Sequence, residues 1–376
     1  MSLFRQIGLS LSISEPAWNS TGFQADLTNE ISGYRHEIRA LGGYWSASFS
    51  MPAGFAYIDD RWLGRHVTVR DDALVIVWEG FIDSMDIRLG GLTLTLGPLL
   101  NIANRVDLVY STVDTTVSPP TVGLRANVGV ANNTGSQTLY GIRSKVLSTG
   151  GATPTTAAYI RDAYLTENAY PQNSKQFSGS GGLGLTFNCL GYVHMLDWPY
   201  SETVTTGTRD ASGKITDILG DDPNLTWNTD HVNANTLQVD AWENDDKLAF
   251  ALIKEVVGHG DIGNNRWLFG VYDALRVWYH AAPTTIAYEQ QLSDDQQAIT
   301  EAGAQVFPWA VQPGKWLLIP DLDVGRSVVS NLTEDLRAAF LESVTYTAPW
   351  NLSWQGSQKE TLPQVLAQLG LAGVGA

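Results

Sequence analysis

Much of the chain alternates between apolar and polar side chains with a period of two, which is the pattern of half-buried β-strands. The segment from Gly43 to Met51 is the clearest case. One of its faces carries Tyr44, Ser46, Ser48 and Ser50, and the opposite face carries Trp45, Ala47, Phe49 and Met51. We therefore expect a half-buried strand here.

Four more strands are expected between His66 and Leu96. The first two are HVTVR and ALVIVWEGFIDS, which are joined at Asp71-Asp72. The next two are MDIRL and LTLTL, which Gly90-Gly91 separate. Two glycines between alternating runs suit the two-residue turn of a tight hairpin. Antiparallel strands at this spacing predict a small barrel or sandwich.

Two segments carry helix signals instead. In the first, Thr153 can cap a helix, Pro154 can occupy its first position and Pro171 ends it. Its apolar face would consist of Ala158, Ile160, Ala163, Tyr164 and Leu165.

The second helix signal is the stronger one and runs from Glu243 to Gly260. Asn244 or Asp245 can cap this helix, and the acidic residues of its first turn suit the helix dipole. Its apolar stripe has helical spacing and consists of Leu248, Leu252, Ile253, Val256 and Val257.

Glycine, proline and small polar residues mark the connections. Pro119-Pro120 and residues 126–138 are expected to be rich in loops, and residues 178–184 to form a Gly/Ser linker that is either flexible or tightly turned. Later strands are expected in NRWLFGVYD and ALRVWYHA, as a hairpin around Asp273-Ala274, and then in KWLLIPDL and AAFLESVTYTA. A short helix is expected in residues 360–376.

This order of elements predicts an α+β protein dominated by β-strands, with two small antiparallel barrel-like domains and mixed segments between them. Residues 1–106 would form the first barrel-like domain, and residues 107–177 a loop-rich segment with a helix. Residues 178–240 would form a mixed β segment, residues 241–347 the second barrel-like domain with its helix, and residues 348–376 a C-terminal tail.

The formal net charge of -16, from 39 acidic and 23 basic residues, argues against a protein that grips nucleic acid. Such proteins need an excess of Lys and Arg to neutralise phosphates. An acidic wall that nucleic acid slides past remains compatible with this charge, because it repels phosphates. The same charge could also serve solubility alone, and composition does not separate these two interpretations.

The single cysteine, Cys189, allows no intrachain disulfide and no cysteine-based zinc site. It lies in the apolar run LTFNCLGYV, so we expect a buried, inert thiol. The N-terminal residues lack the continuous apolar stretch of a signal peptide, and no segment approaches the ~18 apolar residues of a membrane span. We therefore expect assembly in the cytosol and no membrane insertion.

Catalytic signatures are absent from the sequence. The six histidines form no i,i+4 pair, and HMLD (His194 to Asp197) and HGD (His259 to Asp261) are more typical of turns than of catalytic dyads. The adjacent acid pairs are Asp59-Asp60, Asp71-Asp72, Asp221-Asp222, Asp245-Asp246 and Asp294-Asp295. Adjacent acids in a strand point to opposite faces, so these pairs are poor hydrolase sites. We predict no catalytic, cofactor-binding or metal-binding residues.

Aromatic residues are concentrated in the hairpin expected around Asp273, which contains Trp267, Phe269, Tyr272, Trp278 and Tyr279. One face of this hairpin could stack on sugar rings, as in a carbohydrate-binding module. A second interpretation is that these residues form a barrel core and a subunit contact. We favour the barrel core and subunit contact, because the intervening residues are also apolar, as a strand covered on both faces requires.

Three segments resemble the tail-hub and tail-associated proteins of long-tailed bacteriophages. In WEGFIDSMDIRLGGLTLTLGPLLNIANRV (Trp78 to Val106), a W-x-G strand leads to a G-P-L-x-x-x-A-N turn. In the segment from Tyr140 to Pro171, a Y-G-x-R phrase precedes a helix. In the segment from Asn244 to Pro283, a helix is followed by a W-x-x-G-V-Y hairpin.

This resemblance implies barrels similar to those of tube proteins and a homotrimeric ring between the tail tube and the tip. It also implies a non-enzymatic subunit of the virion, assembled in the host cytoplasm. Its partners would be copies of itself, the tail tube, the distal tail protein and the tip or fibre proteins. Genomic DNA would pass through the ring without specific binding.

Three other functions remain open from the sequence. The first is a distal tail or tube ring protein, which would assemble with six copies rather than three. The second is a baseplate module that binds host glycans, which predicts rows of exposed Trp. The third is a glycan-cleaving enzyme with an unrecognised carboxylate pair.

Overall fold

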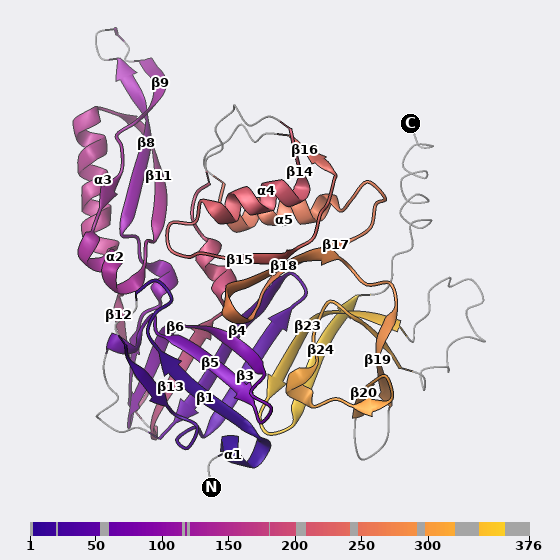
Figure 1. Ribbon diagram of the computed structural model, residues 1–376. Helices are drawn as coiled ribbons and strands as arrows, with labels where there is room; N and C mark the ends of the chain where they lie inside the picture. The colour runs from indigo at the N-terminus through magenta and orange to yellow at the C-terminus, as the bar shows by residue number, and fades with distance from the viewer. Residues whose placement is uncertain are drawn as a thin grey trace, which may run out of the picture.

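The computed structural model describes residues 3–19, 22–52, 60–114, 117–118, 121–179, 181–200, 208–240, 247–291, 298–319 and 338–357. Its helices are α1 (Leu3–Ile7), α2 (Thr134–Tyr140), α3 (Pro154–Asn168), α4 (Ala211–Gly220) and α5 (Ala249–His259). The fold is α+β and dominated by strands, because 18 strands hydrogen-bond into one curled sheet (Figure 1).

The N-terminal part of this sheet consists of β1 (Leu9–Ser14), β2 (Gln24–Asp26), β3 (Gly33–Arg39), β4 (Gly42–Met51), β5 (His66–Asp71), β6 (Ile76–Leu89), β7 (Leu92–Leu96), β12 (Asn173–Phe177) and β13 (Leu183–Leu190). A smaller sheet, set apart from it, consists of β8 (Arg105–Asp114), β9 (Thr121–Asn127), β10 (Ala131–Asn132) and β11 (Ser144–Ala152).

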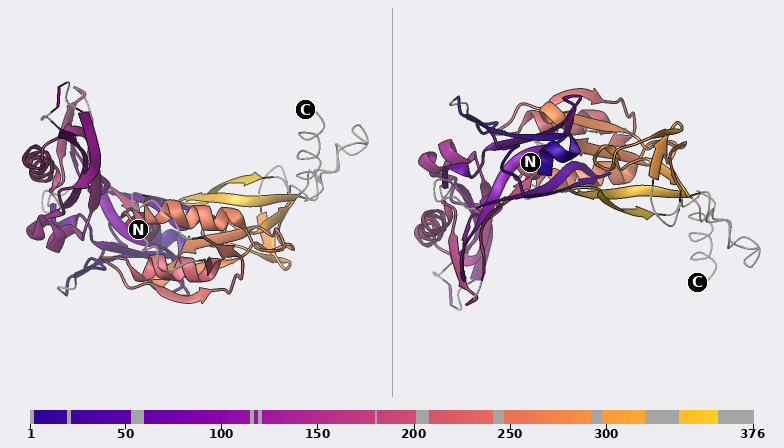
Figure 2. Two further views of the ribbon diagram at one scale, coloured as in Figure 1. Left: turned by 90° about the horizontal axis from the view of Figure 1, so that it is seen from above. Right: turned by 90° about the horizontal axis from the view of Figure 1, so that it is seen from below.

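The remainder of the large sheet consists of β15 (Asn228–Val232), β17 (Trp267–Val271), β18 (Arg276–Ala281), β19 (Ile286–Gln291), β20 (Ala298–Glu301), β21 (Ala304–Gln305), β22 (Trp316–Leu318), β23 (Ala338–Thr347) and β24 (Asn351–Ser357). Strands β14 (Arg209–Asp210) and β16 (Gln238–Val239) form a separate pair beside α4. The smaller sheet lies at one end of an elongated molecule and β23–β24 lie toward the other (Figure 2).

Strand β6 was expected as two strands, residues 73–84 and 85–89, and is in fact one strand of 14 residues. It pairs with β5 and then β7 on one side and with β13 on the other. Gly80 permits this close packing, because a Cβ atom there would lie 2.2 Å from the carbonyl oxygen of Leu190 on β13. The predicted Gly90-Gly91 turn is confirmed, since Leu89 pairs with Leu92.

Strand β4 keeps the predicted alternation only in its second half, where Ala47, Phe49 and Met51 are buried. A register shift in its pairing with β3 skips Trp45, so that Ile38 faces Tyr44 and Glu37 faces Ser46. As a result, Tyr44 is buried and Trp45 is half-buried, the reverse of strict alternation. A bulge of this kind reverses which side chains face the core.

The two predicted helices are both present, but the details differ. Thr153 caps α3 as predicted, because its hydroxyl accepts a hydrogen bond from the backbone N–H of Thr156 at 3.2 Å. Helix α5 begins later than expected, at Ala249, and the predicted caps Asn244 and Asp245 lie outside the described residues. Leu248 is the N-cap residue and is 41% exposed, whereas the rest of the predicted stripe is buried.

Residues 126–138 were expected to be loop and instead contain the end of β9, all of β10 and the start of α2. Asn133 caps α2 by accepting a hydrogen bond from the N–H of Ser136 at 3.1 Å. The predicted helix at residues 360–376 lies outside the described residues. The proposed domain limits stay a prediction.

A buried carboxyl group joins the N-terminal strands to the β17–β18 hairpin. Glu79 on β6 accepts hydrogen bonds from the backbone N–H of Ala274 at 3.1 and 3.2 Å. Ala274 and Leu275 both have positive φ, at 55° and 56°, a conformation that costs energy for residues other than glycine. Burial raises the pKa of Glu79 to about 7, and the negative charge of Asp273 contributes in the same direction.

Replacing Glu79 by glutamine tests this joint. The pKa of Glu79 is raised from 4.5 to about 7, so the folded protein holds this proton more tightly than the unfolded chain. We compare the free energy of unfolding of the natural protein with that of Glu79→Gln. The natural protein's value minus the variant's should fall by about 3 kcal/mol as the pH rises from 4.5 to about 7. Denaturant unfolding at a series of pH values measures the difference.

Two parallel stability curves would contradict the raised pKa of Glu79. Glu289→Gln is the matched control, because Glu289 is exposed on β19. Its difference from the natural protein should stay constant over the same interval.

Candidate assembly interface

Residues 97–172 form an arm that projects from the body of the molecule (Figures 1 and 2). The arm is inserted between two strands that pair with each other, since Leu96 at the end of β7 faces Asn173 at the start of β12. It contains α2, α3 and the sheet of β8 to β11. Its two ends are therefore held side by side by the large sheet.

The arm has a small core of its own. Strand β8 lies at the centre of the arm sheet, with β9 and β10 antiparallel to it along one edge and β11 parallel to it along the other. Helix α3 packs on this sheet, and the buried residues between them are Leu108, Tyr110, Ala152 and Ala157. Four buried residues make a modest core, so contacts at the base of the arm have to hold its position.

Asn104 is fully buried at this base. Its side-chain amide donates to the hydroxyl of Ser136 at 3.1 Å and to the carbonyl oxygen of Gly141 at 2.8 Å. Its side-chain oxygen accepts from the N–H of Arg143 at 2.7 Å. Ser136 in turn donates to the carbonyl oxygen of Ala169 just after α3. One polar network therefore connects the start of the arm, α2 and the end of α3.

Arg143 is a buried cation at the same junction. Its guanidinium group lies over the rings of Phe81, at 5.3 Å, and Trp18, at 5.8 Å. Burial lowers the pKa of Arg143 to about 10, and the nearby carboxylates of Asp83, Asp197 and Asp222 oppose that shift. Arg143 therefore stays charged at neutral pH and connects the arm to the acidic groups of the body.

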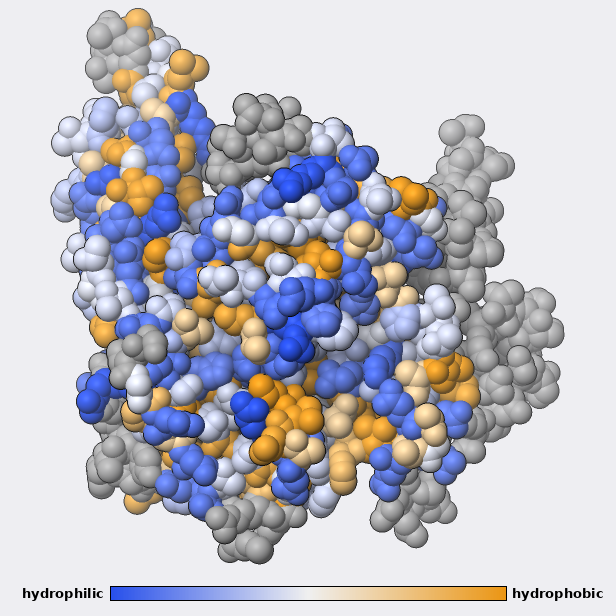
Figure 3. All heavy atoms as spheres, viewed as in Figure 1, coloured by the Kyte–Doolittle hydropathy of each residue, from blue (hydrophilic) through white to orange (hydrophobic). Residues whose placement is uncertain are grey.

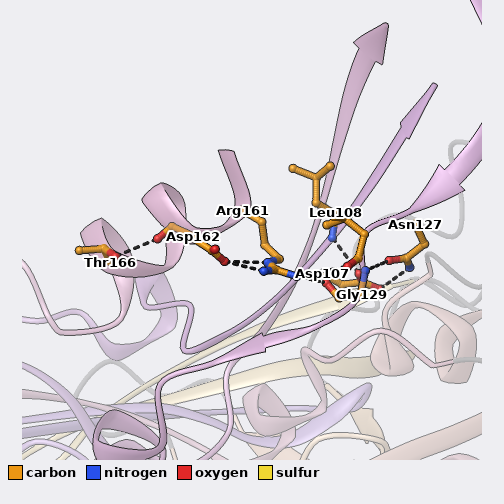
Figure 4. A network of polar contacts seen from close by, with 8 residues as sticks. Asp107, Leu108, Asn127, Gly129, Arg161, Asp162 and Thr166 are labelled. Carbon is orange, nitrogen blue, oxygen red and sulfur yellow. Dashed lines mark hydrogen bonds and ion pairs between the residues drawn. The ribbon is translucent and has the colours of Figure 1, made fainter. Parts of the chain in front are cut away.

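A second network fixes the turn between β9 and β10 (Figure 4). Arg161 on α3 donates to the carbonyl oxygen of Gly129 at 2.9 Å and pairs with Asp162 at 2.7 Å. On the sheet, Asn127 donates to the carboxylate of Asp107 at 2.8 Å and accepts from the N–H of Gly129. These contacts connect the turn after β9 to α3 and to β8.

Exposed apolar side chains gather on the arm and on the strands at its base. Of the 18 large apolar side chains that are exposed among the described residues, ten lie between residues 117 and 183: Val117, Val122, Leu124, Val130, Leu139, Tyr159, Ile160, Tyr170, Phe177 and Leu183. Hydrophobic atoms reach the surface at the tip of the arm, at the upper left of Figure 3. Clustered apolar exposure of this kind marks protein contact sites.

The apolar face that was predicted for α3 is wrong. Ile160 and Ala163 are exposed, and Ala158, Tyr164 and Leu165 are only half-buried. Ala157, which was not predicted to face the core, is the buried residue of this helix. The helix therefore buries Ala157 fully and leaves Tyr159 and Ile160 exposed.

The histidines and adjacent acids, for which no catalytic role is predicted, lie outside residues 97–172. Burial lowers the pKa of His36 to about 3, and partial burial lowers the pKa of the half-buried His66 and His194 to about 4, so these rings are neutral at pH 7. Asp261 of the HGD phrase accepts hydrogen bonds from Asn265 and Trp267, which hold a turn. These bonds, that of Trp267 foremost, lower the pKa of Asp261 to about 2.

The remaining polar candidates are also placed in turns or in the core. Asp71 accepts from the N–H of Val75, and Asp222 accepts from the N–H groups of Asn224 and Leu225. Asp245-Asp246 and Asp294-Asp295 lie outside the described residues, as does Asp59, while Asp60 begins a short turn of helix. Cys189 is buried, as expected, and burial raises the pKa of its thiol.

Across the ranges that the structure describes, no group of three or more His, Cys, Asp or Glu side chains could hold a metal ion. In the same ranges, no helix is long and apolar enough to span a membrane.

No protein-family model matches the chain, and no curated protein matches it by sequence. Among solved structures, the chain is similar to a tail protein from Neisseria meningitidis MC58, with 9% identity, a TM-score of 0.43, and coverage of 94% of this chain and 97% of that one. It is also similar to the 43 kDa tail protein of prophage MuSo2 from Shewanella oneidensis, with 7% identity, a TM-score of 0.42, and coverage of 93% and 97%.

The network around Asn104 gives a direct test of how the arm is held. Asn104→Ala removes three side-chain hydrogen bonds and leaves buried partners unsatisfied, each at a cost of about 1–3 kcal/mol. We expect faster hydrogen exchange of the amides in β8 and β11, measured by mass spectrometry, with little change in β13. Thr155→Ala, at an exposed position of α3 in the same arm, is the control and should change exchange much less.

If Asn104→Ala left exchange in the arm as slow as in the natural protein, the network would not be what holds the arm.

Proposed function

We propose that this chain is a non-enzymatic structural subunit of the tail of a long-tailed bacteriophage, in the baseplate hub that joins the tail tube to the tip. The observation that carries the proposal is the arm, where Val122 and Leu124 are exposed on a strand at the edge of a sheet. A subunit of a permanent assembly buries such surface against its neighbours.

The sequence resemblance to tail-hub proteins supports the same proposal. Its three segments contribute β6 and β7, then β11 and α3, and then α5 with the β17–β18 hairpin. These elements include the strand that carries Glu79, the joint that receives it and half of the arm. The resemblance therefore falls on the framework of the molecule rather than on its connecting loops.

In this proposal, three copies form a ring. Residues 1–106 and residues 241–347 of each copy would serve as the two barrel-like parts. The tail tube, the distal tail protein and the tip or fibre proteins would be its partners in the virion, after assembly in the host cytoplasm. The net charge of -16 suits a channel through which genomic DNA passes without binding.

A second candidate function has an observation of its own. A cavity of about 440 Å³ lies between the β17–β18 hairpin and residues 312–315, with Tyr272, Trp278, His280, Gln312 and Lys315 among its lining. This volume is within the ~300–1,000 Å³ of ordinary ligand sites. Aromatic rings beside amide and charged groups suit a sugar ring, so a host-glycan-binding module is the alternative.

The aromatic hairpin supports that alternative only in part. Trp267, Phe269 and Tyr279 are buried, and Trp278 is 38% exposed. The ring of His231 stacks on Trp278 with 4.5 Å between the ring centroids, which fixes the indole in place. The hairpin therefore presents a single tryptophan rather than the row of exposed tryptophans that the sequence suggested.

The copy number tests the leading proposal. Native mass spectrometry of the purified protein should give a trimer, and electron microscopy of intact particles should place three copies between the tail tube and the tip. Six copies would support a distal tail or tube ring instead. A stable monomer, absent from tail particles, would contradict both.

Binding to bacterial polysaccharide tests the second candidate. The natural protein should bind, Trp278→Ala should weaken binding at least tenfold, and Trp350→Ala should bind normally, because Trp350 is exposed outside the cavity. Glycan arrays followed by calorimetry would measure these affinities. No binding by the natural protein would exclude this function.

A further inference from the structure

We propose that the cavity beside the β17–β18 hairpin binds consecutive sugar units of an uncharged polysaccharide chain. The inference rests on the second candidate function, because it specifies the class of glycan that the same cavity takes. It does not depend on how many copies of the chain assemble. Three observations carry it: a row of aromatic rings along one wall, an opposite wall that is held in place, and charges that are already paired.

One face of the hairpin forms the first wall of the cavity. Alternate positions of its two strands line the cavity: Leu268, Gly270, Tyr272, Trp278 and His280. The positions between them, such as Val277 and Tyr279, belong to the buried core. Successive side chains of a strand point to opposite faces, so the same hairpin supplies both the core and the wall of the cavity.

Four aromatic rings follow one another along this wall. Between ring centroids, Tyr272 lies 5.3 Å from Tyr44 and 6.3 Å from Trp278. His280 follows at 6.0 Å from Trp278. Neighbouring rings in the row meet edge to face, a favourable arrangement that fixes them relative to one another. A pyranose ring is about as wide as one aromatic ring, so the row offers contact surface for consecutive sugars.

The rings of this wall are held in place before any ligand binds. Gly270 makes room for Tyr272, because a Cβ atom built on Gly270 would lie 2.6 Å from Cε2 of the tyrosine ring. The hydroxyl of Tyr44 donates a hydrogen bond to the carbonyl oxygen of Ile76 at 2.9 Å. A wall that is already ordered loses little conformational entropy on binding.

Residues 312–315 form the opposite wall, and hydrogen bonds hold it too. The backbone N–H of Gln312 donates to the hydroxyl of Tyr288 at 3.2 Å. The N–H of Gly314 donates to the carbonyl oxygen of Leu341 at 2.7 Å. Gln312 lines the cavity, and a side-chain amide can both donate to and accept from the hydroxyl groups of a sugar.

The charged groups that line the cavity are paired within the chain. The carboxylate of Asp273 lies 3.4 Å from the guanidinium group of Arg276, and the ammonium group of Lys315 lies 3.0 Å from the carboxylate of Glu301. A charged sugar would have to compete with these partners. The net charge of -16 would also repel an acidic polysaccharide. An uncharged chain meets neither obstacle, and its hydroxyl groups can still donate to Asp273.

Oligosaccharides of increasing length test the inference on the full-length protein. The uncharged probes are oligomers of glucose, of mannose and of N-acetylglucosamine, each from one to six sugars, and oligogalacturonate is the acidic probe. Affinity for at least one uncharged series should rise about fivefold or more with each sugar until the row of rings is covered. The same affinity should be nearly equal in 50 and 500 mM NaCl, because screening weakens only charged contacts.

A variant of Tyr272 distinguishes the row from a site for one sugar. Tyr272→Leu removes a ring beside Trp278, so it should weaken binding of the trisaccharide about fivefold and leave monosaccharide binding, measured by NMR titration, unchanged. Tyr272→Phe keeps the ring and should bind normally. Phe307→Ala is the matched control, because Phe307 is 59% exposed outside the cavity. His280→Ala gives the same test from the other end of the row if Tyr272→Leu lowers the unfolding temperature.

The outcomes separate this inference from the function on which it rests. If a monosaccharide binds as tightly as its trisaccharide, or if only oligogalacturonate binds, the cavity is a glycan site but the inference is wrong. If Trp278→Ala abolishes binding while Tyr272→Leu and His280→Ala leave trisaccharide affinity unchanged, the row is wrong. If none of these probes and no bacterial polysaccharide binds, both the inference and the second candidate function are wrong.

Discussion

The structure depends on one strand being paired along both of its sides. Over its 14 residues, β6 pairs with β5 and β7 on one side and with β13 on the other, and it is buried along most of its length. Three separate parts of the molecule attach to it. Glu79 accepts a hydrogen bond from the turn of the β17–β18 hairpin. Asp83 accepts a hydrogen bond from the N–H of Leu100, where the arm begins. The C-terminal end of β6 forms a hairpin with β7.

The two buried carboxyl groups of β6 explain how distant parts of the chain keep a fixed geometry. Each is desolvated, and burial raises the pKa of both Glu79 and Asp83. Each is also bound by backbone N–H groups, which favour the charged form and lower the pKa. The hairpin and the start of the arm supply these N–H donors. Displacing either element would therefore leave a buried carboxylate without its partners, which is costly.

Local patterns were sufficient to predict part of this fold. Two glycines marked the β6–β7 turn, and Thr153 with Pro154 marked the start of α3. Features that depend on tertiary pairing were not predictable. The bulge at Trp45 arises from the register of β3 against β4, and β9 has almost no buried side chains to reveal a period of two. The exposed apolar residues of the arm are of the same types as buried core residues. Their exposure can therefore be recognised only in the folded structure.

The insertion of the arm between β7 and β12 means that the arm could be replaced without rebuilding the sheet. Because Leu96 and Asn173 face each other in adjacent strands, about 5 Å apart, a short turn could replace the whole arm without altering the sheet. The exposed apolar residues of the arm are thus physically separable from those that build the framework. Arms of different length or sequence could therefore replace one another while the body of the fold stays unchanged.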